Sequence, residues 1–281
     1  MKKFDADKVK KANIVIFDEM CSKYDRLRRV TFSTDVFKSE LSKIGSLFTN
    51  KYQNNQRFLS VGCGTGSVVL NLVLNRDIKE PYGIDISLGM LEKCRENAIR
   101  LGINMRFVKG DAENLPYKDN SFGFIIVHGI LHHLPNYEKC ICDCYRSLKI
   151  GGFCLIIEPS LKANKIIAIL RWITWSVFLL YKRLSKSESE KLIDIRTFGF
   201  REMEEKCHDA GFSSVRIERF SGFSSRIFYW LTDPIAQRTT NKLIHLFINK
   251  IISILNILDN KMFSRIIPQE WFDEFIVVLK K

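Results

Sequence analysis

A short run of glycines is the part of the sequence best suited to hold a charged ligand. In FLSVGCGTGSVVLN, residues 58–71, Gly62, Gly64 and Gly66 alternate directly after an apolar segment. Glycine permits backbone conformations and close approaches that other residues do not. A helix that begins after such a turn presents amide groups that favour anions. A glycine turn alone is a weak signal, so its partners elsewhere in the chain decide what it holds.

Two aspartates are candidates for those partners. Asp85 ends the apolar segment PYGID about 20 residues after the glycine turn, the spacing expected for a carboxylate that binds a ribose diol. Asp111 follows the apolar segment NMRFVKG, where a carboxylate can accept a hydrogen bond from the exocyclic amine of adenine. The dinucleotide fingerprint requires glycine or alanine where Ser67 stands, and no second nucleotide-binding half follows. These residues predict a cofactor with one nucleoside.

A second group of residues could move protons. His132 and His133 lie in LHHLP after the apolar segment 122–129, and Glu158 lies near the end of the apolar segment 151–159. If both segments are neighbouring parallel strands, their carboxyl ends bring the histidines and the glutamate together as an acid–base pair. The alternative is structural, with the histidines packing or capping the loop.

Alternating strands and helices must position these groups. Apolar segments predict strands at 57–62, 81–86, 104–111, 122–129, 151–159, 213–220 and 275–280. Helices are predicted at 67–74, 88–101, 137–148 and 201–210. Strands with few polar residues, separated by helices, indicate a parallel sheet buried on both faces. We therefore predict a doubly wound, Rossmann-like α/β fold preceded by a helical segment over residues 1–55.

Five motifs follow one another along this predicted core: GCGTG, GIDIS with MLEKCRENA, VKGDAENLPYKDNSF, VHGILHHLP and RSLKIGGFCLIIEP. In this order and at these distances, they resemble the class I S-adenosylmethionine-dependent methyltransferases. The resemblance is greatest to the branch of the ubiquinone and menaquinone C-methyltransferases and small-molecule methyltransferases. It covers roughly residues 15–160, 198–220 and the last strand. It implies a seven-stranded sheet with six parallel strands and an antiparallel last strand.

The same resemblance implies S-adenosylmethionine as the cofactor and assigns residues to it. The residues implied to line its methionine part belong to the glycine turn: Gly62, Cys63, Gly64 and Gly66. Those implied at its nucleoside are Asp85 on the ribose, Ile86 against the adenine, and Asp111 with the Ala112 amide at the adenine edge. His128 would line the sulfonium side, and Tyr24 would cover the cofactor.

Two positions depart from the family pattern. The family usually has an acidic residue where Ser60 stands, and that residue helps to fix the amino group of the cofactor. The family's LKPGG is LKIGG here, with Ile150 in place of proline. A hydroxyl at Ser60 replaces a charge-assisted partner, so we expect weaker cofactor binding rather than its loss.

Two segments interrupt the alternation, at 161–195 and 222–271. The sequence thus divides into an N-terminal segment, 1–55, a methyltransferase core, 56–160 with 196–221 and 272–281, and the two insertions. The insertions are predicted to be helical and to form a cap. Either they pack on each other over the site, or they expose apolar surface to lipid or to a prenylated substrate. Both can hold together.

Each insertion contains a strongly apolar stretch. In the first, residues 166–181 fall short of the roughly 20 needed to cross a bilayer. Aromatic residues and flanking cations instead suit a helix in the membrane interface, with peripheral contact through 165–183. In the second, NKLIHLFINKIISILNILDN predicts a helix that is apolar over most of its surface.

Charge and cysteine usage bear on partners and location. The net charge of +13 favours acidic partners, although a lysine-rich surface is the simpler explanation. Eight cysteines without a CxxC pair predict a reduced protein, and the charged start MKKFDADKVKK predicts no signal peptide. We therefore expect a cytoplasmic protein, peripheral on the inner face of the membrane. Cys140 and Cys144 share a predicted helical face and are expected to pack, and no metal site is predicted.

The function predicted first is methyl transfer to a small, lipophilic or lipid-linked acceptor at the membrane surface. The second is a soluble small-molecule methyltransferase with a helical lid. A third, from another class, is an RNA-binding or RNA-modifying protein, but no aromatic-and-basic strand motif supports nucleic acid as a partner. A fourth is a cofactor-binding protein without catalysis.

Overall fold

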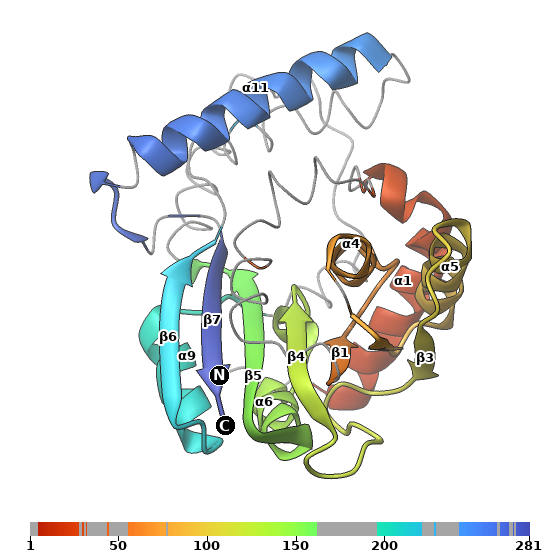
Figure 1. Ribbon diagram of the computed structural model, residues 1–281, viewed down its shortest axis with the longest axis vertical. Helices are drawn as coiled ribbons and strands as arrows, with labels where there is room; N and C mark the ends of the chain where they lie inside the picture. Colours follow the sequence, from red (N-terminus) through yellow and green to blue (C-terminus); the bar gives the residue numbers. More distant parts are fainter. Residues whose placement is uncertain are drawn as a thin grey trace.

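The protein is built on a seven-stranded sheet (Figure 1). The computed structural model describes residues 5–27, 56–76, 78–161, 196–220, 242–262, 265–269 and 274–281, with residues 30, 32, 44, 228 and 272 singly. The strands are β1 (Arg57–Val61), β2 (Glu80–Asp85), β3 (Arg106–Lys109), β4 (Phe122–His128), β5 (Leu148–Pro159), β6 (Ser214–Arg219) and β7 (Glu274–Lys280). Their order is β3-β2-β1-β4-β5-β7-β6. The neighbouring strands β3, β2, β1, β4 and β5 pair in parallel, and β7 is antiparallel to both of its neighbours, β5 and β6. The predicted fold class is confirmed.

Helices cover both faces of the sheet. They are α1 (Ala6–Leu27), α4 (Ser67–Asn75), α5 (Leu88–Arg100), α6 (Tyr137–Ser147), α9 (Phe200–Asp209) and α11 (Lys242–Lys261). Side chains of α4 and α5 pack in the core on one face, and those of α6 and α9 pack on the other. Helix α1 lies beside α5, and α11 crosses beyond the carboxyl ends of the parallel strands (Figure 1).

The central strand shows why the sequence signal was a continuous apolar run. In β4, Phe124 and Ile126 enter the core beneath α4 and α5, while Ile125 and Val127 enter the opposite core. All four side chains are fully buried. Because each face of β4 is covered by helices, alternation of polar and apolar residues is absent.

Most predicted boundaries differ from the observed ones by one or two residues, and the boundary between α6 and β5 moves a residue from helix to strand. Leu148 was expected to end the helix before β5, but it begins the strand and pairs with Phe122. The side chain of Leu148 is fully buried, so its apolar character fits the sheet as well as the helix. The proposed division into core, N-terminal segment and cap remains a prediction, because residues 162–195 and most of 222–241 lie outside the described part.

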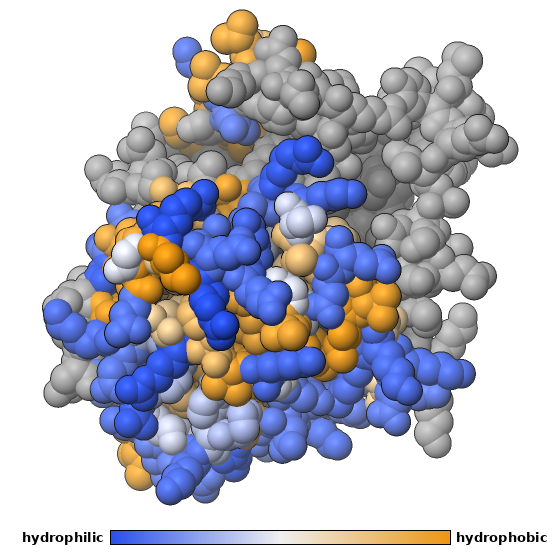
Figure 2. Space-filling model, turned by 90° about the vertical axis from the view of Figure 1, so that its right-hand side faces the viewer, coloured by the Kyte–Doolittle hydropathy of each residue, from blue (hydrophilic) through white to orange (hydrophobic). Residues whose placement is uncertain are grey.

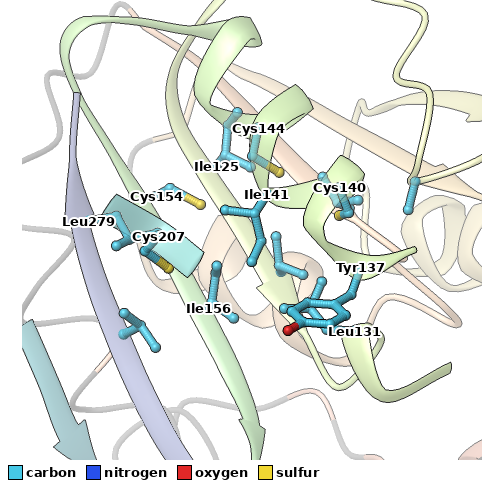
Figure 3. Close-up of a cluster of buried hydrophobic side chains, with 14 of the residues drawn as sticks. Ile125, Leu131, Tyr137, Cys140, Ile141, Cys144, Cys154, Ile156, Cys207 and Leu279 are labelled. Atoms are coloured by element: carbon cyan, nitrogen blue, oxygen red, sulfur yellow. The ribbon is translucent and has the colours of Figure 1, made fainter. Parts of the chain in front are cut away.

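The predicted packing role of the α6 cysteines is confirmed. Figure 3 shows Cys140 and Cys144 on α6 facing the core beside Cys154 of β5 and Cys207 of α9. All four are free thiols with no exposed surface. Burial raises the pKa of Cys207 to about 12, so this thiol stays protonated and unreactive.

Candidate active site

The carboxyl ends of β1 and β2 bring the glycine turn and Asp85 together. The backbone φ angles of Gly62, Gly64 and Gly66 are 64°, 53° and 92°, in the left-handed region that disfavours other residues. Asp85 Oδ2 accepts a hydrogen bond from the Gly64 amide at 2.8 Å, and its Oδ1 accepts one from the Ser87 amide at 3.0 Å. The carboxylate therefore ties the glycine turn to the end of β2.

The environment of Asp85 weakens its ionisation. Burial raises the pKa of its carboxyl above the ordinary value, and the amides of Ser87 and Gly64 offset only part of this effect. The carboxylate of Asp18 on α1 adds a further, smaller rise. Asp18 Oδ1 itself accepts hydrogen bonds from Ser87 Oγ at 2.5 Å and from the Gly89 amide at 2.9 Å. Helix α1 thus caps the start of α5 directly beside Asp85.

The residues after β3 form an ion-paired cluster with α1. Lys10 Nζ lies 2.7 Å from Asp111 Oδ2 and 2.7 Å from Glu113 Oε2. Glu113 is buried and its Oε1 accepts a hydrogen bond from the Asn136 amide at 2.6 Å. Burial lowers the pKa of Lys10, but the hydrogen bonds to both carboxylates outweigh it and raise the pKa overall. Asp111 therefore stands at the predicted adenine edge already paired with a cation.

We expect Lys10→Met to lower the free energy of unfolding by about 1–3 kcal/mol, because Glu113 would keep a buried carboxylate without its cationic partner. Lys8→Met on the same helix is the matched control. Lys8 pairs with Asp5 at 3.8 Å and both side chains are more than half exposed, so that change should stay within about 0.5 kcal/mol. Urea unfolding followed by circular dichroism measures both. Equal effects would mean that the Lys10 cluster is no stronger than a surface pair.

The ends of β4 and β5 hold a second hydrogen-bonded group. Glu158 is fully buried, and its Oε1 accepts hydrogen bonds from the amides of Ile130 at 2.9 Å and Leu131 at 2.7 Å. Its Oε2 lies 2.7 Å from His132 Nδ1. The carboxylate therefore fixes both the loop after β4 and the orientation of the His132 ring, whose side chain is 15% exposed.

His133 and His128 have different surroundings. The His133 ring is tilted by 47° to that of His132, with centroids 3.8 Å apart, and meets Phe17 of α1 edge-on at 5.3 Å. His128 ends β4, half-buried, and its ring lies 6.5 Å from that of Phe220 beyond β6. The cofactor roles of four further residues stay predictions: Tyr24 on α1, Cys63 in the glycine turn, Ile86 directly after β2 and Ala112 in the loop after β3.

Ser60 lies inside the sheet rather than at its edge. It is 5% exposed and pairs in register with Gly83 of β2 and Ile126 of β4. Two hydrogen bonds hold the glycine turn to β2, from the Gly64 amide to Asp85 and from the Cys63 amide to the Ile84 carbonyl, and neither involves Ser60. The turn therefore keeps its shape with serine at this position.

The sequence predicted a role in the site for Tyr24 of α1 but none for the other α1 residues that contact it. Lys10, Asn13, Phe17 and Tyr24 recur at spacings of three, four and seven along α1, so they share one side of the helix. Asn13 Nδ2 donates to the His133 carbonyl at 3.0 Å, and Phe17 meets the His133 ring. This spacing of residues along one side of α1 was the sequence signal that could have indicated these contacts.

Together, the fold and these contacts define an α/β enzyme that binds a nucleoside cofactor where the strand order reverses. The residues present fit S-adenosylmethionine. A Cβ on Gly64 would have no atom within 4 Å, so the turn faces open space beside the start of α4. Asp85 and Asp111 supply acceptors for hydroxyl and amine groups, and Gly62, where a Cβ would lie 2.4 Å from Ile130, leaves no room for a larger residue.

Comparisons with known proteins agree with this definition. A family model described as a methyltransferase domain matches residues 59–156. The demethylmenaquinone methyltransferase of Staphylococcus aureus is 29% identical over 219 residues, covering 74% of this chain and 87% of that protein. A SAM-dependent methyltransferase from Thermotoga maritima, described as a possible histamine N-methyltransferase, has a TM-score of 0.55 at 18% identity, covering 95% of this chain and 99% of that one.

A further solved structure contains the product of the cofactor. The Haemonchus contortus phosphoethanolamine N-methyltransferase 2, in complex with S-adenosylhomocysteine, has a TM-score of 0.55 at 18% identity, covering 85% of this chain and 52% of that one. The match to a methyltransferase domain and the similarity to the relative from Staphylococcus aureus support an S-adenosylmethionine-dependent methyltransferase. Within the described ranges, none of its helices combines the length and apolar character needed to cross a membrane.

Proposed function

We propose that this methyltransferase acts on a small, lipophilic or lipid-linked acceptor, with His132 as the base that accepts its proton. The observation that carries the proposal is the His132–Glu158 contact of 2.7 Å at the same sheet edge as the glycine turn and Asp85. S-adenosylmethionine supplies an activated methyl group when bound. The protein must hold it, align the acceptor and exclude water, and remove a proton where the acceptor carries one.

The binding roles follow from the two halves of the site. In the proposal, Asp85 accepts hydrogen bonds from the ribose hydroxyls, and Asp111 accepts one from the adenine amine while retaining Lys10. The glycine turn and the start of α4 receive the methionine part. These assignments place the reacting end of the cofactor toward β4, on the side where His132 lies.

His132 is assigned as the base because its contact with Glu158 favours one tautomer of the ring. A carboxylate at Nδ1 favours the neutral ring with its proton on Nδ1, which makes Nε2 the basic nitrogen. Glu158 is fully buried, so in this proposal it positions His132 and does not contact the acceptor. His133 packs against Phe17 and is assigned to holding α1.

Two features support a lipophilic acceptor. The relative from Staphylococcus aureus is named for demethylmenaquinone, a lipophilic quinone. In addition, α11 lies beyond the carboxyl ends of the strands (Figure 1) and exposes several large apolar side chains, among them Leu243 and Phe247. The predicted membrane contact through 165–183 lies outside the described residues and stays a prediction.

Transfer of a labelled methyl group identifies the acceptor class. We expect protein incubated with methyl-labelled S-adenosylmethionine and a cell extract to place label in the organic-solvent fraction of the extract. The aqueous small-molecule fraction and the RNA should stay unlabelled. Asp85→Asn is the control, since label that stays at the wild-type level in this variant would come from another enzyme. Label in the aqueous fraction or in RNA would contradict the lipophilic acceptor.

A further inference from the structure

Helix α11 presents two different sides. Large apolar residues on one side are half to three-quarters exposed: Leu243 at 73%, Leu246 at 66%, Phe247 at 65%, Ile254 at 50% and Ile257 at 52%. Their spacing of three, four and seven residues places them along one stripe, called here the outer stripe. On the inner side, Ile248 and Asp259 are 5% and 1% exposed. The helix is therefore anchored by a narrow inner side while its outer stripe stays uncovered.

The charges of α11 are distributed in the same two-sided way. Asp259 is the only acidic residue among the 20 of the helix, and it is buried. It lies near Arg219 of β6, whose pKa is lowered by burial while the attraction of Asp259 opposes that change. Lys250 is exposed within the outer stripe, and Arg265 is exposed just beyond the helix. The outward surface thus combines apolar side chains with cations and no acid from α11.

The position of α11 relates this surface to the site. Figure 1 shows the helix crossing beyond the carboxyl ends of β4 and β5, which carry His132 and Glu158. In Figure 2, orange side chains stand at the top of the molecule, where Figure 1 places α11. A surface that meets the outer stripe would therefore lie on the same side of the protein as the reacting groups.

We propose that the outer stripe docks on an anionic lipid bilayer, with α11 lying flat in the interface. A helix of this length, about 30 Å, can bury an apolar stripe in the acyl boundary while its lysines reach the headgroups. Charge complementarity selects this occupant: anionic headgroups match Lys250 and Arg265, whereas a second copy of the chain would bring like cations together.

The inference rests on the proposed function in one respect only: docking of α11 on the bilayer would bring a lipophilic acceptor to the site. Flotation is therefore measured without substrate, so that it can fail while methyl transfer survives, or succeed if the acceptor class is wrong. The probes are vesicles of phosphatidylcholine alone and of phosphatidylcholine mixed with phosphatidylglycerol.

Wild-type protein should float with the anionic vesicles, less with the neutral ones, and be partly released by high salt. The double variant Leu246→Asp with Phe247→Asp should lower the bound fraction about tenfold or more. Lys250→Glu should reduce binding only to the anionic vesicles. The matched control is Ile99→Asp on α5, which changes an apolar residue exposed to 73% and should float like wild type. Unchanged cofactor affinity in calorimetry shows that each variant is folded.

Three outcomes would overturn the proposal: no flotation of wild-type protein at low salt, flotation that survives the double variant, or equal loss in Ile99→Asp. Sedimentation equilibrium tests the main competitor. Self-association of wild-type protein that the double variant abolishes, in the absence of flotation, would assign the outer stripe to a second copy of the chain instead.

Discussion

Replacing Asp85 with alanine should weaken S-adenosylmethionine binding by about 100-fold or more. The proposed loss is two hydrogen bonds to a charged group, each contributing about 1.5–3 kcal/mol. The variant also removes the acceptor that holds the Gly64 amide at 2.8 Å, so the glycine turn keeps only the bond from the Cys63 amide to the Ile84 carbonyl of β2. Titration calorimetry measures the affinity directly.

The same carboxylate predicts the pH dependence of binding. Ionised Asp85 accepts the ribose hydrogen bonds, and burial raises the pKa of the carboxyl in the free protein. Affinity should therefore be complete above that raised pKa and fall as the pH drops through it, starting at a higher pH than for an ordinary aspartate. Asp85→Asn should bind weakly with no such dependence.

Asp143→Ala is the control for these variants. Asp143 also accepts an amide hydrogen bond, from Leu115 at 2.6 Å, and pairs with Arg146, but it lies on α6. Its loss should lower stability and leave cofactor affinity unchanged. Equal weakening in both variants, or unchanged affinity in Asp85→Ala, would mean that the cofactor does not bind at the end of β2.

Changing Glu158 should separate stability from catalysis. Glu158→Ala should lower the free energy of unfolding by about 2–5 kcal/mol, because two buried amides and His132 lose their acceptor. Glu158→Gln should be milder, since its amide oxygen can still accept from Ile130 and Leu131. Its amide nitrogen, however, would donate to His132 Nδ1 and move the ring proton to Nε2. Methyl transfer to an acceptor that must lose a proton should then fall about 10²–10⁴-fold.

His132→Gln tests whether that loss acts through the base. It should reduce kcat to the level of Glu158→Gln, with little change in cofactor affinity, and the double variant should be no worse than either single one. Thermal unfolding and single-turnover transfer provide the two measurements. Full activity of a folded Glu158→Gln protein would show that His132 is not the base, and a structural role for the LHHLP loop would then suffice.

The features that could be predicted from the sequence are those whose residues lie close together along the chain. The strands were found because both faces of β4 are covered, so Phe124 to Val127 form an uninterrupted apolar run. The glycine turn and Asp85 were found because their chemistry requires particular residue types at a fixed spacing. These signals lie within short stretches of sequence, so they can be recognised without knowing which segments lie nearby in the fold.

Contacts between distant segments left no such signal. Lys10 meets Asp111 from 101 residues away, and Asp18 meets Ser87 from 69 residues away. A lysine or aspartate on a helix is usually solvated, so residue type alone does not indicate a partner. Burial of Glu158 likewise depended on the order β4-β5-β7, which covers the end of β5 on both sides.

The attachment of α1 makes the N-terminal helix and the cofactor thermodynamically linked. Asp18 caps α5 beside Asp85, and Lys10 pairs with the carboxylate proposed to meet adenine. If detaching α1 weakens cofactor binding by some factor, bound cofactor must hold α1 in place by the same factor. Hydrogen exchange of the α1 amides would then report how full the site is, at a position where no chemistry takes place. Detachment of α1 from the core would thus become rarer as more of the protein carries bound cofactor.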